Sequence, residues 1–143
     1  MAAGRDLRRD ALTLALVAAS ALTSGVLAQD AGSSTTSSIV DGVFTATQAS
    51  SGQQQFQRAC ASCHAVGEHA GRKFAARWAG STLGDLFELV RDTMPESDPG
   101  SLEPAEYAGI LAFFLKESGY KEGERDLPSD VEALKKIRIE PLP

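Results

Sequence analysis

The five residues Cys-Ala-Ser-Cys-His at positions 60–64 carry the strongest chemical signature in the chain. Two thiols three residues apart can each add to one vinyl group of a haem, and the histidine that follows can ligate the iron. One alternative, a thioredoxin-like dithiol, needs a β-α pattern around it. Another, a structural zinc site, needs four ligands, whereas only His69 and carboxylates remain nearby. We therefore predict one covalently attached haem c, held by Cys60 and Cys63, with its iron bound to His64.

Met94 is the candidate for the second axial ligand of this iron. Of the two methionines, Met1 is lost if the N-terminus is processed as described below. Met94 lies 30 residues after His64 and directly before Pro95. Proline disfavours helical backbone for the preceding residue, which favours an extended strand able to cross a haem face. The alternative is a methionine that fills a gap in the core. His69 is a rival ligand, but five residues are too few to reach the opposite haem face, so we expect it on the loop surface.

The identity of the sixth ligand separates two classes of function. A thioether ligand favours ferrous iron and raises the reduction potential relative to a second histidine. If Met94 ligates, no coordination position remains for a substrate, and the chain is an electron-transfer protein rather than an enzyme. The alternative is a haem enzyme or gas sensor with an open sixth site, such as a peroxidase-like protein.

A helix is predicted over residues 45–59, so that the cysteine motif follows its end. Thr45 and Gln48 have the spacing of a capping box, in which each side chain bonds to the other residue's backbone. Gly52 lies eight residues before the first cysteine, on the same helical face. Glycine within a helix costs about 1 kcal/mol relative to alanine, so Gly52 predicts the close approach of another helix.

Two further long helices are predicted over 83–92 and 104–118, where apolar side chains recur at helical spacing. Their apolar stripes comprise Leu83, Leu86, Phe87, Val90, Tyr107, Ile110, Leu111 and Phe114. Gly119 is placed to cap the second of these helices. A short helix is predicted over 131–136 with Ser129 as its N-cap. These elements make the fold class all-α.

Taken in order, these features resemble the small class I c-type cytochromes over roughly residues 46–120. The matching motifs are Gly52-x-x-x-Phe56-x-x-x-Cys60-Ala61-Ser62-Cys63-His64, Met94-Pro95 and Tyr107-x-x-Ile110-x-x-Phe113-Phe114-Leu115. The resemblance implies a cytochrome c-like fold in which three to four helices pack around one covalent haem. In that family the terminal helices cross with a small residue against an aromatic one, which implies Tyr107 or Ile110 as the neighbour of Gly52.

The chain departs from this family in the loop after the haem motif. Family members commonly carry a proline there, whose carbonyl holds the axial histidine. No proline lies between His64 and Met94 in this sequence, so the group that orients His64 stays open.

A narrower resemblance is to small bacterial cytochromes c that work beside quinoprotein dehydrogenases. The similar segments are 78–87, 93–95, 118–120, 127–128 and 133–138. This resemblance implies redox protein partners, with a dehydrogenase as electron donor and an oxidase or other cytochrome as acceptor. A tightly bound electron-transfer subunit of such a dehydrogenase, docked through its C-terminal tail, is the alternative to a free carrier.

Two residues of the loop before Met94 are candidates for contacts with the haem propionates. Buried carboxylates need cationic or N–H partners, which Arg77 and Trp78 can supply. The alternatives are a solvated surface position for Arg77 and simple packing against the haem edge for Trp78.

The charge of the chain disfavours nucleic acid as a partner. The net charge is −5, whereas a phosphate backbone needs a basic face. Between Pro95 and Asp130, nine acidic residues stand against three basic ones. This segment is either a solvated surface or a docking face for a basic partner.

The N-terminus has the pattern of a signal peptide. Arginines precede an apolar stretch, and Val26-Leu27-Ala28 supplies small residues for cleavage after Ala28. We predict a signal peptide over 1–28, a flexible Ser/Thr-rich leader over 29–44, a haem domain over 45–120 and a C-terminal extension over 121–143. The location is then periplasmic or otherwise exported, with no stable membrane insertion after cleavage. An uncleaved anchor is the alternative, although the purely apolar run is shorter than the ~20 residues of a spanning helix.

Overall fold

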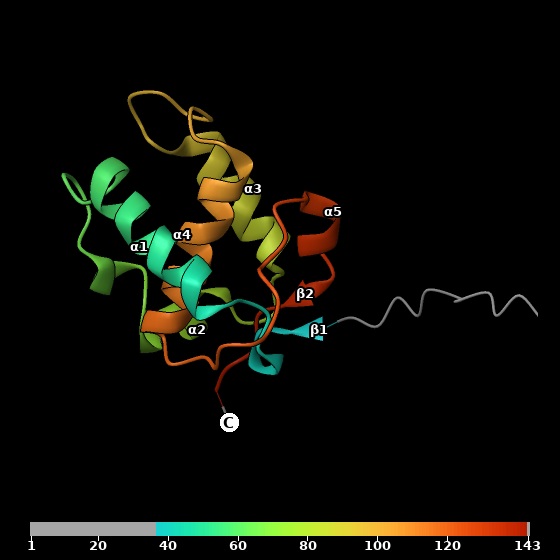
Figure 1. Ribbon diagram of the computed structural model, residues 1–143. Coiled ribbons are helices and arrows are strands. Elements are labelled where there is room, and N and C mark those ends of the chain that lie inside the picture. Colours follow the sequence, from blue (N-terminus) through green and yellow to red (C-terminus); the bar gives the residue numbers. More distant parts are fainter. Residues whose placement is uncertain (1–36, 143) are drawn as a thin grey trace, which may run out of the picture. The chain divides into compact units, whose positions relative to one another are not determined.

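The computed structural model describes residues 37–142, and helices dominate this part of the chain (Figure 1). The helices are α1 (Ala46–Ala59), α2 (Arg72–Trp78), α3 (Leu83–Thr93), α4 (Pro104–Glu117) and α5 (Val131–Leu134). Short 3-10 turns span Ile39–Asp41 and Val66–Glu68. The two-residue strands β1 (Ser37–Ser38) and β2 (Ile137–Arg138) pair in parallel. The predicted all-α class is confirmed.

Helices α1 and α4 cross so closely that their backbones touch. A Cβ atom added to Gly52 of α1 would lie 1.8 Å from the Gly109 carbonyl oxygen and 2.9 Å from the Ile110 nitrogen of α4. The close approach predicted from Gly52 is therefore confirmed. Its nearest neighbour is Gly109, followed by the backbone nitrogen of Ile110, one of the two expected neighbours, whereas Tyr107 is not among the nearest contacts.

The first helix begins as predicted but uses only half of the expected capping box. The Thr45 hydroxyl accepts a hydrogen bond from the Gln48 N–H at 3.1 Å. The Gln48 side chain bonds instead to Leu127 of the C-terminal tail. Its amide nitrogen donates to the Leu127 carbonyl at 2.8 Å, and its amide oxygen accepts from the Leu127 N–H at 2.7 Å. Gln48 thus ties α1 to the tail.

The other predicted helices lie within one or two residues of their expected bounds. Helix α3 has a complete capping box between Thr82 and Asp85, and Gly119 follows α4 with a φ of +88°. Helix α5 is shorter than predicted, and Asp130 rather than Ser129 caps it by accepting from the Ala133 N–H at 2.9 Å.

Helix α2 was not predicted, because its sequence Arg-Lys-Phe-Ala-Ala-Arg-Trp offers only two large apolar residues. These are Phe74 and Trp78, which are four residues apart and so lie on one face. Phe74 is buried and Trp78 is partly buried against the core. The helix brings three cations to one segment of the fold, namely Arg72, Lys73 and Arg77.

Residues 37–44, predicted as part of a flexible leader, form ordered structure. Ser37 and Ser38 pair with β2, and Ile39 and Phe44 are fully buried in the core. The Ser/Thr-rich composition of this segment favours flexibility. Strand β1 is nevertheless held in place by its pairing with β2, about 100 residues later in the sequence. The predicted signal peptide over 1–28 and the rest of the leader lie outside the described residues. Within residues 37–142, no helix combines the length and the apolar character needed to cross a membrane.

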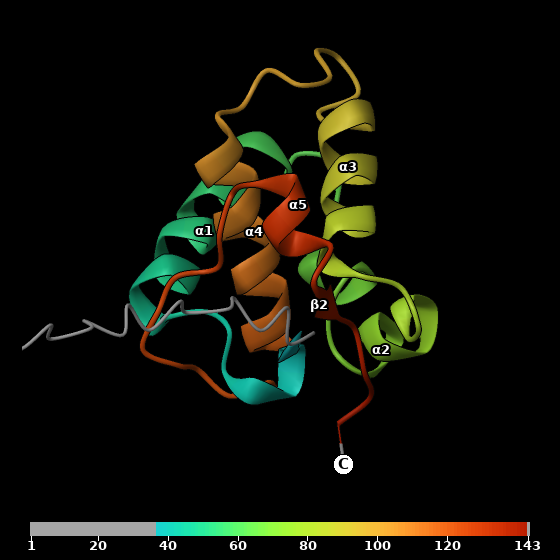
Figure 2. The ribbon, with the colours of Figure 1, turned by 90° about the vertical axis from the view of Figure 1, so that its right-hand side faces the viewer.

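The C-terminal tail packs onto the same core and against α3 (Figure 2). Its buried side chains are Leu127, Leu134, Ile137 and Ile139. A Cβ on Gly84 of α3 would lie 2.8 Å from the Lys135 nitrogen, so α5 lies directly on that helix. Lys135 also forms an ion pair with Glu88 of α3 at 3.3 Å. The tail therefore supports the helix that leads into Met94.

Candidate haem site

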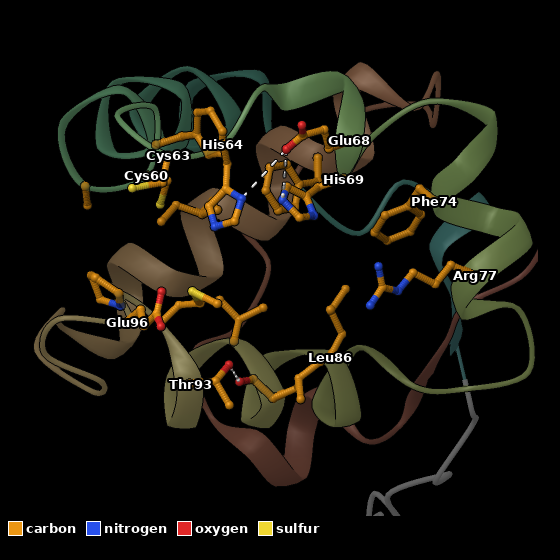
Figure 3. Close-up of a pocket in the computed structure, with 18 of the residues that line it drawn as sticks. Cys60, Cys63, His64, Glu68, His69, Phe74, Arg77, Leu86, Thr93 and Glu96 are labelled. Carbon is orange, nitrogen blue, oxygen red and sulfur yellow. Dashed lines mark hydrogen bonds and ion pairs between the residues drawn. The ribbon is translucent and has the colours of Figure 1, made fainter.

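One cavity of about 650 Å³ gathers the residues that the sequence singles out (Figure 3). Its walls come from the end of α1, the loop after it, α2, α3, the start of the loop after α3, and α4. All six predicted site residues line it: Cys60, Cys63, His64, Arg77, Trp78 and Met94. Leu86, Val90 and Ile110 are also in the lining, as expected from their helical stripes, whereas Leu83 and Phe87 lie in the core outside it.

The cysteine motif folds into a tight turn at the end of α1. Cys60 is the C-cap of that helix, and its carbonyl accepts from the N–H groups of Cys63 at 3.1 Å and His64 at 2.9 Å. Both thiols are free. Burial raises the pKa of the half-buried Cys60 thiol, whereas Cys63 is exposed. The turn thus places two unpaired thiols and one imidazole at the same wall of the cavity.

A carboxylate group lies near the Nδ1 atom of His64. Glu68 Oε2 lies 3.7 Å from His64 Nδ1 and also accepts from the Ala65 N–H at 3.3 Å. A histidine that binds a metal through one ring nitrogen usually donates from the other, which fixes the ring orientation. Glu68 was not predicted for this role, although its position four residues after His64 is the spacing at which side chains meet on a helical turn.

His69 lies in the loop and is partly exposed, but its ring also lines the cavity, which the prediction of a surface position missed. The His69 ring stacks on Phe114 of α4 with centroids 5.8 Å apart and meets the His64 ring edge-to-face at 4.8 Å. It lines the cavity beside His64 (Figure 3). Burial lowers the pKa of His69, with the nearby His64 as a second cause. The short link to His64 holds both rings on one side of the cavity.

Met94 lines the same cavity as His64. Figure 3 shows His64 on one side and Leu86 and Thr93 of α3 on the other. Met94 directly follows Thr93 and also lines the cavity. Its backbone is extended, with φ −132° and ψ 149°, so the helix ends before the proline as predicted. His64 and Met94, the predicted fifth and sixth ligands of the iron, thus line one cavity.

Two hydrogen bonds hold the main chain of Met94. Its N–H donates to the Val90 carbonyl at 2.8 Å, and its carbonyl accepts from the Tyr107 hydroxyl at 2.7 Å. Tyr107 was predicted as a member of the apolar stripe and as a possible neighbour of Gly52, but not as a partner of Met94. The side chain is almost fully buried, and its hydroxyl is the polar group that links α4 to the end of α3.

The cations of the cavity come from α2. The Arg77 side chain points into the cavity, across from the wall of α3, and its guanidinium lies 5.4 Å from the centroid of the Trp78 ring (Figure 3). Lys73 lies in the same lining. Within residues 37–142, neither cation has a carboxylate within ion-pair distance. This part of the cavity can therefore receive an anionic group.

These donors fit a covalently bound haem. They comprise two free thiols, an imidazole, a thioether, apolar side chains, and two cations without an ion-pair partner among residues 37–142. The volume lies within the range of ordinary cofactor clefts, roughly 300–1,000 Å³. A tetrahedral zinc site fits less well, because the only group of metal-binding side chains found within residues 37–142 is His64, Glu68 and His69, and it contains no thiol.

Comparison with known proteins points to the same cofactor. Residues 47–114 match the model of the family described as cytochrome c oxidase, cbb3-type, subunit III. No curated protein and no solved structure matches the chain. The matched range, just under half of the chain, contains the cysteine motif and Met94. Together with the helical architecture, the match supports a c-type cytochrome domain with a cytochrome c-like fold, which implies haem c with its iron and electron transfer between redox protein partners.

Proposed function

We propose that this chain is an exported, monohaem class I c-type cytochrome that carries one electron at a time. One observation carries the proposal: a single cavity brings together Cys60, Cys63, His64 and Met94 from segments up to 34 residues apart. These are the residue types that hold haem covalently and close both axial positions of its iron. When bound, haem supplies an iron that changes its oxidation state by one electron.

Cys60 and Cys63 are proposed to attach the group through thioether bonds. Addition of each thiol S–H across one vinyl group would hold the haem and would need no oxidant. The free state of both thiols supports this role. A Cys60–Cys63 disulfide would remove both nucleophiles, and export into an oxidising compartment makes that the competing reaction.

His64 and Met94 are proposed as the axial ligands. The Glu68 carboxylate lies 3.7 Å from His64 Nδ1, where its negative charge would increase the electron density on the imidazole and favour ferric iron. The thioether of Met94 acts in the opposite direction and favours ferrous iron. Their balance, together with the exclusion of water by the apolar lining, sets the reduction potential.

Arg77 and Trp78 are proposed as contacts of the haem propionates. The Arg77 guanidinium points into the cavity and the Trp78 ring lines it, as the contact requires. An unpaired guanidinium beside apolar side chains is well suited to a carboxylate, because the charge-assisted hydrogen bond compensates its desolvation. Lys73 joins this set on the same helix.

The proposed partners are a quinoprotein dehydrogenase as donor and an oxidase or other cytochrome as acceptor. The resemblance of segments such as 78–87 to cytochromes of that kind supports this proposal. The acidic segment 95–130 is proposed to face a basic patch on a partner, which makes association faster at low salt. The tail beyond residue 120 uses its apolar side chains within the chain itself, which supports a free carrier rather than docking through the tail.

Optical spectroscopy of the ferric protein tests this function. The protein is produced in cells with haem-maturation machinery, and a Met94→Ala variant is the matched comparison. We expect a low-spin spectrum with the weak red-region band of thioether-ligated ferric haem in the wild type, and loss of this band in Met94→Ala. A wild-type protein that lacks the band and readily binds carbon monoxide when reduced would favour the open-site enzyme or sensor instead.

A further inference from the structure

We propose that Tyr107 is a positioning residue for the sixth iron ligand, because its hydroxyl fixes the main chain that carries the Met94 thioether. The inference rests on the proposed function, in which Met94 ligates the iron. Tyr107 itself does not line the cavity, so it acts only through Met94.

The contact is well defined in geometry. The Tyr107 hydroxyl donates to the Met94 carbonyl at 2.7 Å, a good hydrogen-bond length, while the Leu102 N–H approaches the same hydroxyl only at 3.5 Å. The Tyr107 side chain is 1% exposed. The Tyr107 hydroxyl is therefore largely shielded from competing water.

The place of Met94 in the chain explains why this hydrogen bond holds the segment in position. Met94 is where α3 ends, and the following residue, Pro95, has no N–H with which to anchor the chain. The bonds from Met94 N–H to Val90 and from Tyr107 to the Met94 carbonyl hold both polar groups of this residue. Removing the second bond leaves a carbonyl that must find water, and the segment can then move away from the cavity.

The ring of Tyr107 has a separate, structural role. It packs edge-to-face on Phe87 of α3, with centroids 6.0 Å apart and planes at 75°. Tyr107→Phe keeps this packing and removes only the hydroxyl. The substitution thus isolates the bond to Met94 from the contact between the two helices.

Tyr120 offers a matched control in the same molecule. It is 4% exposed, its hydroxyl donates to the Glu140 carbonyl at 2.7 Å, and its ring packs on Phe74 at a centroid distance of 6.3 Å. Tyr120→Phe therefore removes an equivalent hydrogen bond far along the chain from Met94. A general loss of stability affects both variants, whereas loss of ligand positioning affects only Tyr107→Phe.

The test titrates the ferric holoproteins with imidazole, which competes with the Met94 thioether for the iron. One hydrogen bond of ordinary strength corresponds to about a fivefold change in an equilibrium constant. We expect Tyr107→Phe to bind imidazole about fivefold more tightly than the wild type and to lose the red-region band at lower temperature, with Tyr120→Phe unchanged in both. Equal imidazole affinity in Tyr107→Phe and wild type, or an equal gain in Tyr120→Phe, would overturn the inference.

A second measurement needs no variant and covers the case in which Tyr107→Phe does not accumulate as holoprotein. Proton NMR of the ferrous wild type should show a slowly exchanging Tyr107 hydroxyl close in space to Met94, and rapid exchange of that proton would contradict the inference. A wild type without the red-region band would overturn the proposed ligation together with this inference, whereas an intact band with an unaffected Tyr107→Phe overturns only the role of Tyr107.

Discussion

The crossing of α1 and α4 allows a quantitative test through two single-methyl substitutions. In Gly52→Ala the new Cβ would lie 1.8 Å from the Gly109 carbonyl oxygen and 2.2 Å from its carbon. In Gly109→Ala the new Cβ would have its nearest contact at 3.4 Å, with Gly52 Cα. The two glycines face each other, yet only the first of them lacks room for a methyl group.

The expected size of the effect follows from this geometry. The Cβ in Gly52→Ala is about 1.6 Å short of the 3.4 Å at which ordinary contact begins, and the obstacle is backbone that cannot rotate away. Overfilling a packed core costs roughly 1–3 kcal/mol, and more when backbone has to shift. Alanine recovers about 1 kcal/mol in helix propensity. Because the contact is with backbone, we take the upper end of that range and expect a net loss of about 2 kcal/mol for Gly52→Ala, which lowers Tm by roughly 10 °C in a domain of this size. Gly109→Ala should be neutral or slightly stabilising.

Thermal unfolding of the two holoproteins, followed by far-ultraviolet circular dichroism, measures this difference. The haem content of both samples is matched beforehand, so that a loss of cofactor does not imitate a loss of packing. A Gly52→Ala protein as stable as Gly109→Ala would refute the reasoning, because it would mean that the helices do not meet at these backbones.

Three further predictions concern the cofactor, its axial histidine and the cap of α3. A Cys60→Ser/Cys63→Ser variant, which cannot attach haem, should lose most of its helical circular dichroism because a small domain depends on the buried cofactor for its core; native-like helicity would count against this. Glu68→Gln removes the negative charge 3.7 Å from His64 Nδ1 and should raise the reduction potential by a few tens of millivolts in voltammetry; an unchanged potential would argue that the carboxylate does not act on the ligand. Hydrogen bonds from Thr82 hold the pKa of Asp85 below its ordinary value of 3.8. The stability that Asp85 contributes is therefore complete above pH 3.8, and it is lost as the pH falls through the lower pKa of the folded state. Asp85→Asn should therefore be less stable than wild type near neutral pH and equal to it in strong acid, as denaturant midpoints at several pH values can show, and a difference independent of pH would contradict the linkage.

The chemistry of the site was predictable because it depends on rare residue types at fixed spacing. The motif at 60–64 specifies two thiols and an imidazole within one turn, and Met94 is identified by the proline that follows it. Helices α3 and α4 were predictable because their apolar residues recur every three to four positions, and α1 from its Thr45 cap and the four-residue spacing of Gly52, Phe56 and Cys60. The structure brings Cys60, Cys63, His64 and Met94 to one cavity.

The remaining features depend on contacts between distant segments, which local patterns do not encode. Ser37 and Ser38 are polar residues whose order comes from pairing with β2. Gln48 has the spacing of a capping residue but bonds to Leu127, and Tyr107 has the spacing of a core residue but bonds to Met94. Helix α2 was missed for a different reason, since two apolar residues in seven are too few to establish a period.

The central claim is that Cys60 and Cys63 hold one haem covalently, and the mass of the denatured protein tests it most directly. The protein is purified from cells with haem-maturation machinery and measured intact under denaturing conditions, which remove any group that is not covalently bound. We expect the mass of the polypeptide plus one haem, and the polypeptide mass alone when both cysteines are replaced by serine. A wild-type mass without haem, or two hydrogens lighter because of a Cys60–Cys63 disulfide, would contradict the account.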